Sequence, residues 1–521
     1  MTGIRQKTGY IWAFLIALLP RLFWSLQAIP LRTVSDELST MNGAVFFSSQ
    51  NWNAVVSKAG YYGFGMSILA TPLMQWIKDP VILYRTLLVC TGVLESVAAV
   101  ICFYLIKRVF GITDEKKALL MTVTISYITV VRTTVFYNEH MLMLISWCIC
   151  LVLAKLVLTE EPKKRAMWTG FFVLLMLYAL TVHARTTTYI FAAVLVIALY
   201  GLMYRKKMVS LSVFGILTAG GYLLIKKGTK IYQSVVWSAA EGVRNTRVNI
   251  GQEKLSLLKT ADGIKSCLFT IFGQINIASM ISGGLLITAL VMVILLIVRK
   301  GKEAFVLKTI QADNAQERLY FVIGSFFVLC TGMTIAAQSL TWIATAANAI
   351  AGGYGTKEYG TKAFTYLRYM MPYLQPLLML VFVTMEKQKD VFLSCFHKSI
   401  KYIVLFQGIW LAFILPYCYG NKQAGEEFIC FALADRNIAT AHTYLPATLV
   451  FVIMLLIFFQ AGKKEKFQVI MVVLLVVAGY KYCYNAYNWD ILTQKKTEKK
   501  IDTVYQVLGS GELGKEQLTD K

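Results

Sequence analysis

The chain has 521 residues, of which 57% are apolar and only 15% are charged, against about 25% charged residues in a typical soluble domain. This composition excludes a simple soluble enzyme and predicts an all-α polytopic membrane protein. The formal net charge is +24, which would suit either nucleic acid or the anionic inner leaflet of a membrane. The apolar content favours the membrane, so we expect membrane lipids and no nucleic acid among the partners.

A membrane-spanning helix needs about 20 mostly apolar residues. Stretch 62–76 is apolar but short and contains Gly63, Gly65 and Pro72, so we expect an interfacial or re-entrant helix there. The bundle of transmembrane helices should form one domain over 1–487, and the polar tail at 488–521 is too short to fold independently. Thirteen segments are predicted to span: 9–28, 81–106, 118–136, 138–158, 167–183, 187–204, 208–225, 276–298, 320–338, 367–385, 402–419, 442–460 and 467–487.

The basic residues lie in every second connection between these segments, which sets the predicted orientation through the positive-inside rule. With the N-terminus in the cytoplasm, every short inner connection is basic. We therefore expect a multi-pass protein of the plasma membrane, with its larger loops and its tail outside. The inner connections carry Lys107, Arg108, Lys116, Lys117, 163–165, 205–207, Arg299, Lys300, Lys302, Lys387, Lys389, Lys463, Lys464 and Lys466, and the outer loops are 29–80, 226–275, 339–366 and 420–441.

Two acidic residues, Asp36 and Glu37, follow the first predicted span. One of them could act as a general base toward an acceptor hydroxyl while the other supports the site, because adjacent side chains point apart. A solvated loop or a helix cap is the alternative interpretation. At the next two outer turns, Glu139 and His140 and then His183 and Arg185 (with Arg85 earlier in the chain) are further candidates for an outward-facing cavity, since ionisable groups are expensive there.

Arg368 and Tyr369 come just before Pro372, where the tenth predicted span begins. The planar guanidinium of an Arg matches phosphate oxygens, so Arg368 is a candidate for binding a phosphate, with Arg185 as a second. Near the middle of the second predicted span lies Glu95, which should be neutral, paired or facing a cavity, and Arg21 is a candidate partner.

Cysteines and metal ligands give weaker signals. Cys418 and Cys430 could face the outside together and form a disulfide or remain free thiols. Glu139, His140 and His183 are residue types that bind divalent metals, but their spacing is not a metal-binding motif, so no cofactor is assigned.

Carboxylates and arginines thus converge on the outer face, whereas the inner face carries only the basic excess that topology requires. A site that opens outward has no access to cytosolic nucleotide sugars or ATP. It needs an energised donor that has already crossed the membrane, and a polyprenyl-phosphate conjugate is the common kind.

Several motifs resemble those of the GT-C class of integral-membrane glycosyltransferases, in particular the family 39-like branch that includes protein O-mannosyltransferases and bacterial aminoarabinose transferases. The likeness covers about 9–200 well and the rest loosely. The motifs are Asp36-Glu37 after the first span, the apolar 61–76 stretch followed by Asp79-Pro80, the Arg85-containing 83–88, the basic 104–111, Asn138-Glu139 at the fourth span, and Arg368-Tyr369 with Pro372 and Pro376.

This resemblance implies transfer of a sugar, with inversion, from a polyprenyl-phosphate donor to an acceptor at the outer face. Asp36 would be the base and Glu37 its support, while Arg368, Arg185 and Tyr369 would bind the donor phosphate. Some members of the family use a divalent metal. The large soluble modules of some relatives are missing, so a lipid-linked or surface glycan is a better candidate acceptor than a folded protein.

Two other interpretations remain open. A transporter or flippase of a lipid-linked sugar would use the same basic cavity without a base. A polymerase or ligase of surface polysaccharides usually has a large outer loop rich in Arg and His, whereas 226–275 contains Arg244 and Arg247 but no His.

Overall fold

The computed structural model describes residues 2–28, 35–48, 63–128, 135–236, 251–307, 314–418 and 441–495. Within these ranges the chain forms helices and no β-strand. Eight of the helical segments in the described ranges are long and apolar enough to cross a membrane. The protein is therefore an all-α membrane protein, as its composition predicts.

The first half of the chain contains helices α1 (Thr2–Gln27), α2 (Ser35–Phe47), α4 (Gly65–Trp76), α5 (Pro80–Tyr104), α6 (Glu115–Ile128), α7 (Asn138–Leu158), α8 (Pro162–Val182), α9 (Thr187–Tyr204) and α10 (Leu211–Val236). The second half contains α11 (Gln252–Leu257), α12 (Ala261–Ile281), α13 (Leu285–Lys302), α14 (Ala315–Thr341), α15 (Ile343–Ala351), α16 (Met371–Lys387), α17 (Lys389–Ile409), α18 (Leu415–Cys418), α20 (Ala441–Ala461) and α21 (Glu465–Lys495).

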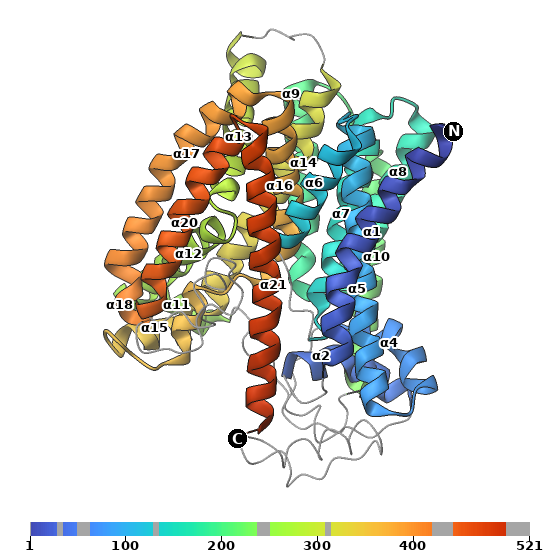
Figure 1. Cartoon of the computed structure of the whole chain (residues 1–521). Coiled ribbons are helices and arrows are strands. Elements are labelled where there is room, and N and C mark those ends of the chain that lie inside the picture. The colour runs from blue at the N-terminus through green and yellow to red at the C-terminus, as the bar shows by residue number, and fades with distance from the viewer. Residues whose placement is uncertain are drawn as a thin grey trace.

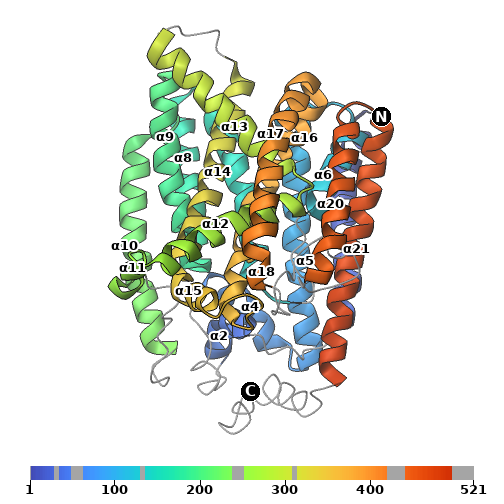
Figure 2. The same ribbon diagram turned by 90° about the vertical axis from the view of Figure 1, so that its left-hand side faces the viewer.

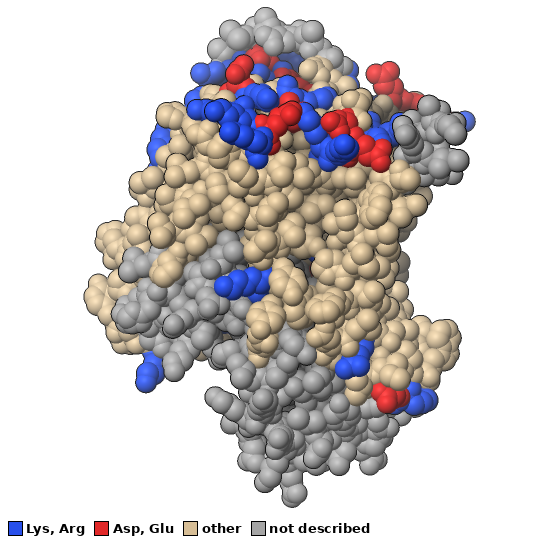
Figure 3. All heavy atoms as spheres, in the orientation of Figure 1, with Lys and Arg blue, Asp and Glu red and all other residues tan. Residues whose placement is uncertain are grey.

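The long helices run side by side between two ends of the molecule (Figures 1 and 2). Charged side chains gather at the upper end in Figure 3, and the surface below them is almost free of charge where the residues are described. At this charged end, Lys117 of α6 binds Glu386 of α16 at 2.9 Å and Glu465 of α21 at 2.7 Å. These two carboxylates raise the pKa of Lys117 by hydrogen bonding. The short helices α2, α4 and α15 lie at the opposite end.

Helix α16 lies in the core of the bundle, in contact with α7, α13, α14 and α17. Its residues from Met371 to Met385 are all buried. One polar side chain inside it, Gln375, accepts a hydrogen bond from the indole of Trp147 on α7 at 2.7 Å. The buried amide oxygen of Gln375 therefore has a hydrogen-bond partner. The one-turn 3₁₀ helix Arg368–Met370 directly precedes α16, which fixes the position of Arg368 relative to the core.

One predicted span is wrong. The segment 276–298 is not a single helix, because α12 ends at Ile281 and α13 starts at Leu285. Gly283 and Gly284 between them have positive φ angles of 57° and 82°, which favour glycine. A Cβ atom on Gly283 would also lie 2.1 Å from the ring of Phe458.

The predicted outer loop 226–275 is also wrong in part, since α10 extends to Val236 and α12 already begins at Ala261. Hydropathy fails here because several uncharged polar residues of α12 are buried in the protein interior. Thr270 and Gln274 are fully buried, and the Gln274 amide donates to the carbonyl of Ala363 at 2.9 Å. Their hydrogen bonds make them compatible with a membrane helix.

Other boundaries differ by less. Helix α17 begins at Lys389, not at 402, and the described part of α6 ends at Ile128, not at 136. Helix α21 continues to Lys495, eight residues into the predicted tail. Cys418 is a buried free cysteine, whereas Cys430 lies outside the described residues.

Candidate functional site

Asp36 and Glu37 occupy the first turn of α2, where carboxylates are favoured by the positive end of the helix dipole. The Asp36 side chain keeps 22% of its surface exposed, whereas Glu37 as a residue is only 1% exposed. Asp36 Oδ2 accepts a hydrogen bond from Arg368 Nη2 at 2.5 Å. Of the two acids, Asp36 is therefore the one with access to a substrate.

Glu37 has different partners from Asp36. Its Oε1 accepts hydrogen bonds from the Tyr84 hydroxyl and from the backbone N–H of Phe136, both at 2.8 Å. These contacts join α2 to α5 and to the segment that leads into α7. Glu37 is thus placed to position neighbouring elements rather than to meet a substrate.

Glu139 connects the two arginines. It lies in the first turn of α7, and its Oε1 is 2.7 Å from Arg185 Nη2 and 3.4 Å from Arg368 Nε. Arg185 comes from the 3₁₀ turn between α8 and α9. Asp36, Arg368, Glu139 and Arg185 form one continuous set of ion pairs, which we call the ion cluster.

Aromatic rings pack on both guanidinium groups of the ion cluster. The Arg185 carbon Cζ lies 3.8 Å from the centre of the Tyr369 ring, and that of Arg368 lies 4.3 Å from the centre of the Tyr137 ring. Cation–π contacts of this kind hold a guanidinium in place without occupying its N–H groups. The rings therefore fix both arginines while leaving their donors available.

Several of these N–H donors are not hydrogen-bonded within the described residues. Arg185 Nε and Nη1 and Arg368 Nε are buried, and none of them makes a hydrogen bond to a described residue. An unpaired buried donor of a charged group is expensive, and Arg is the residue best suited to bidentate binding of phosphate. The ion cluster therefore has the donors that an oxyanion would need.

His183 lies against the ion cluster without adding to its charge. Its Nδ1 accepts a hydrogen bond from the backbone N–H of Arg185 at 3.1 Å. Burial, together with the positive charges of Arg185 and Arg368, holds the pKa of His183 well below its ordinary value. The ring is therefore neutral at physiological pH.

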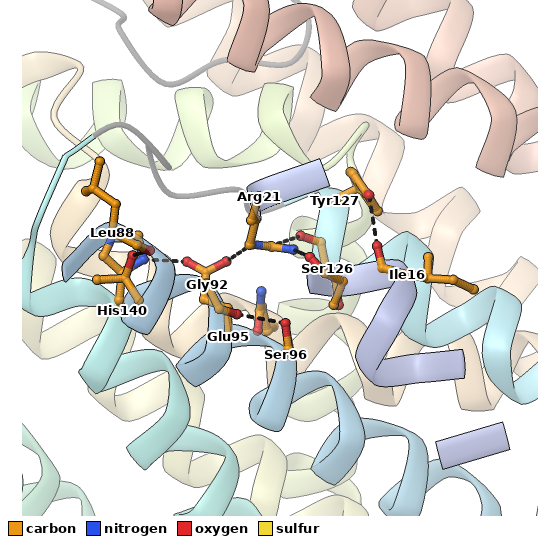
Figure 4. A network of polar contacts seen from close by, with 12 residues as sticks. Ile16, Arg21, Leu88, Gly92, Glu95, Ser96, Ser126, Tyr127 and His140 are labelled. Atoms are coloured by element: carbon orange, nitrogen blue, oxygen red, sulfur yellow. Dashed lines mark hydrogen bonds and ion pairs between the residues drawn. The ribbon is translucent and has the colours of Figure 1, made fainter. Parts of the chain in front are cut away.

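Two of the predicted cavity residues lie elsewhere. His140 binds Glu95, which also pairs with Arg21, in a separate buried group (Figure 4). Arg85 donates from Nε to the carbonyl of Ala28 at 3.0 Å and forms no ion pair within the described ranges. The pairing of Arg21 with Glu95 confirms a contact that the sequence suggested.

No group of three His, Cys, Asp or Glu side chains in the described part of the chain could hold a metal ion. Glu139, His140 and His183 are accordingly not arranged as a metal site.

Two residues of the site, Tyr137 and Tyr84, were not assigned a role from the sequence. The sequence could have indicated them by their neighbours, since Tyr137 precedes Asn138-Glu139 and Tyr84 precedes Arg85.

Comparison of the chain with protein-family models, with curated proteins and with solved structures finds no match.

Proposed function

We propose that the protein is a membrane glycosyltransferase that moves a sugar from a polyprenyl-phosphate donor to an acceptor hydroxyl at the extracytoplasmic face, with inversion. The acceptor would be a surface glycan, a lipid or a protein. The observation that carries this proposal is the ion cluster, in which a partly exposed carboxylate, Asp36, adjoins Arg368, and Arg185 follows through Glu139. A base next to unfilled phosphate-binding donors is what the reaction needs.

In this mechanism the donor phosphate binds to Arg185 and Arg368 through N–H groups that make no hydrogen bond to a described residue. Competition from the phosphate would loosen the contact between Arg368 and Asp36 and leave Asp36 as a base. The acceptor oxygen then attacks the anomeric carbon while its proton passes to Asp36 and the bond from that carbon to the phosphate oxygen breaks. The electron pair of this bond leaves with the phosphate, and the two arginines stabilise the added charge.

The proposed topology is multi-pass, with the N-terminus in the cytoplasm and the ion cluster outside. The concentration of charge at one end supports it (Figure 3), because basic connections stay in the cytoplasm. Asp36, on α2, belongs to the opposite end, where that helix lies (Figure 1). The donor would reach the site from the outer leaflet.

Transport of a lipid-linked sugar is a second candidate, and one observation favours it. Helices α12 and α13 are separated by a break at Gly283 and Gly284, and discontinuous helices are common at the binding sites of secondary transporters. Transport needs a sealed compartment, whereas transfer to an acceptor proceeds in detergent. This difference separates the two functions.

The decisive experiment incubates purified protein in detergent with labelled polyprenyl-phosphate sugars and candidate acceptors. We expect transfer by the wild type and at least a hundredfold loss in Asp36→Asn, on the scale of general-base catalysis. Asp390→Asn is the matched control, because Asp390 also lies in the first turn of a helix but on α17 and exposed. Unchanged transfer by Asp36→Asn would remove Asp36 as the base, and vesicle-dependent uptake without transfer would favour transport.

A further inference from the structure

A second group of charged side chains lies inside the bundle, apart from the ion cluster. Arg21 on α1, Glu95 on α5 and His140 on α7 are 4%, 4% and 1% exposed. They point toward one another in Figure 4 and form the buried triad. Glu95 Oε2 pairs with Arg21 Nε, and Glu95 Oε1 lies 2.6 Å from His140 Nδ1.

The two ring nitrogens of His140 both face oxygen atoms. Nδ1 faces the Glu95 carboxyl group at 2.6 Å, and Nε2 faces the backbone carbonyl of Val135 at 3.1 Å. A neutral imidazole has one donor and one acceptor nitrogen, and an ionised carboxylate and a carbonyl can only accept. With neutral His140 and ionised Glu95, one of these two contacts would therefore set lone pair against lone pair.

One additional proton removes the conflict. It can sit on His140, which then donates from both nitrogens, or on Glu95, whose hydroxyl then donates to Nδ1 while Nε2–H donates to Val135. With Arg21 the triad carries a charge of +1 in both arrangements. We propose that Glu95 and His140 together form a proton-binding site, which holds one proton more than a neutral histidine and an ionised carboxylate.

Among the ion pairs of the described residues, His140 is linked to Glu95, and Glu95 is linked in turn to Arg21. Helix α6 contributes the backbone carbonyl of Ser126, which accepts from Arg21 Nη2 at 3.4 Å, and Tyr127, whose hydroxyl donates to Ile16 at 3.2 Å.

Two further charged side chains, one on α7 and one on α16, which packs against α7, have other partners. On the same helix as His140, Glu139 pairs with Arg185. On α16, Glu386 pairs with Lys117 at the charged end. The proton is therefore governed by the triad.

The proton has a structural consequence at the candidate functional site. Val135, which accepts from His140, is followed by Phe136, whose N–H binds Glu37. The next residue, Tyr137, packs on the guanidinium of Arg368. A protonated triad thus fixes the segment 135–137, which contains Tyr137 and binds Glu37 through a backbone N–H. Loss of the proton breaks one of the two contacts of His140. The proton site would exist whether or not the ion cluster transfers sugar.

Nitrogen NMR of histidine-labelled protein tests the proposal directly, since the chain contains only four histidines. Replacing His183, His397 and His442 by Gln leaves His140 as the single signal. We expect either protons on both ring nitrogens, or a proton on Nε2 with Nδ1 accepting a hydrogen bond from Glu95. A neutral ring with its only proton on Nδ1 would overturn the proposal.

A second test uses thermal unfolding in detergent between about pH 6 and pH 9. A folded state that binds an extra proton loses stability as the pH rises, so the unfolding midpoint of the wild type should fall. Glu95→Gln mimics the protonated acid, because its amide can donate to a neutral His140 and accept from Arg21. This variant should fold and lose that slope, while His397→Gln, exposed on α17, should retain it. A slope as steep in Glu95→Gln as in the wild type would contradict the proposal.

Discussion

The two buried ionic groups of this protein, the ion cluster and the buried triad, differ in how completely their donors are used. In the triad, Arg21 binds Glu95, the carbonyl of Ala17 at 2.7 Å and the carbonyl of Ser126. In the ion cluster, Arg185 makes one ion pair and keeps two buried nitrogens without a hydrogen bond to any described residue.

A charged group inside a membrane protein is tolerated when its partners offset the loss of water. The triad meets this condition from within the chain, which suits a structural and proton-holding role. The ion cluster meets it only in part, which suits a site that a ligand completes. Substitutions should therefore affect stability most in the triad and ligand handling most in the cluster.

The largest expected effect is on stability. Glu95→Ala leaves the Arg21 charge buried without its carboxylate, and breaking a buried ion pair lowers the free energy of unfolding by about 3–5 kcal/mol. Thermal unfolding and the yield of monodisperse protein measure this effect. Glu95→Gln is the control and should retain most of the stability. Equal losses in the two variants would show that packing, not hydrogen bonding, sets the role of Glu95.

The next effect is on transfer. In the proposed mechanism Arg185 stabilises the developing phosphate charge, so Arg185→Ala should lower the rate of transfer by about 100- to 1,000-fold. Its effect on thermal unfolding should be smaller than that of Glu95→Ala, because Glu139 still faces Arg368 at 3.4 Å. If Arg185→Ala unfolds readily but transfers sugar at the normal rate, the ion cluster has a structural role and not a ligand-binding one.

Ligand binding should stabilise the cluster. A short-chain prenyl phosphate at about 100 times its dissociation constant would add about 2.7 kcal/mol to the stability of the wild type. The gain should disappear in Arg185→Ala, and the corresponding prenyl alcohol should give none. An equal gain with phosphate and alcohol would mean that the lipid tail alone is recognised.

A smaller effect depends on pH. Because the folded pKa of His183 is lowered by burial and by the two arginines, its contribution is present above the unfolded value of about 6.5 and is lost as the pH falls. The wild type should therefore lose more stability than His183→Gln between about pH 7.5 and pH 5 in thermal unfolding. This dependence of stability on pH is opposite in sign to the one expected from the buried triad. Parallel curves of unfolding midpoint against pH for the wild type and His183→Gln would contradict the prediction.

The smallest effect is expected at the charged end. Lys117→Met breaks the contacts to Glu386 and Glu465, but both partners are partly exposed, so the change should stay below about 1 kcal/mol. It should shrink further at high salt because of screening. A larger, salt-independent loss would show that these contacts hold α6, α16 and α21 together more strongly than surface pairs usually do.

Much of the helical pattern could be predicted from hydropathy. Helix α7 begins and ends where the fourth segment was predicted, and α9 where the sixth was. The prediction failed at α12, where the amide of the buried Gln274 donates to the carbonyl of Ala363, because a hydropathy window cannot distinguish an interior polar residue from a loop residue. It also started α17 too late, at 402, because the exposed Lys398 and Lys401 lower the hydropathy of the first half of that helix, which begins at Lys389.

The sequence identified candidate residues of the site but not their contacts. Asp36, Glu139, Arg185 and Arg368 were all candidates, and the structure brings them together. The sequence also grouped His140 with them, although that side chain points to Glu95. Neighbouring residues on a helix point in different directions, so adjacency in the chain does not decide which of Glu139 and His140 joins which group.

The contact between Asp36 and Arg368 joins residues 332 positions apart. Membrane proteins are made from the N-terminus, so Asp36 and Glu139 are synthesised long before the arginine that pairs with both. Since Arg368 directly precedes the buried helix α16, entry of that helix into the core and completion of the ion cluster would be one event. The cluster would thus form only after most of the bundle has been inserted, and an interrupted chain would contain its acids without their main cation.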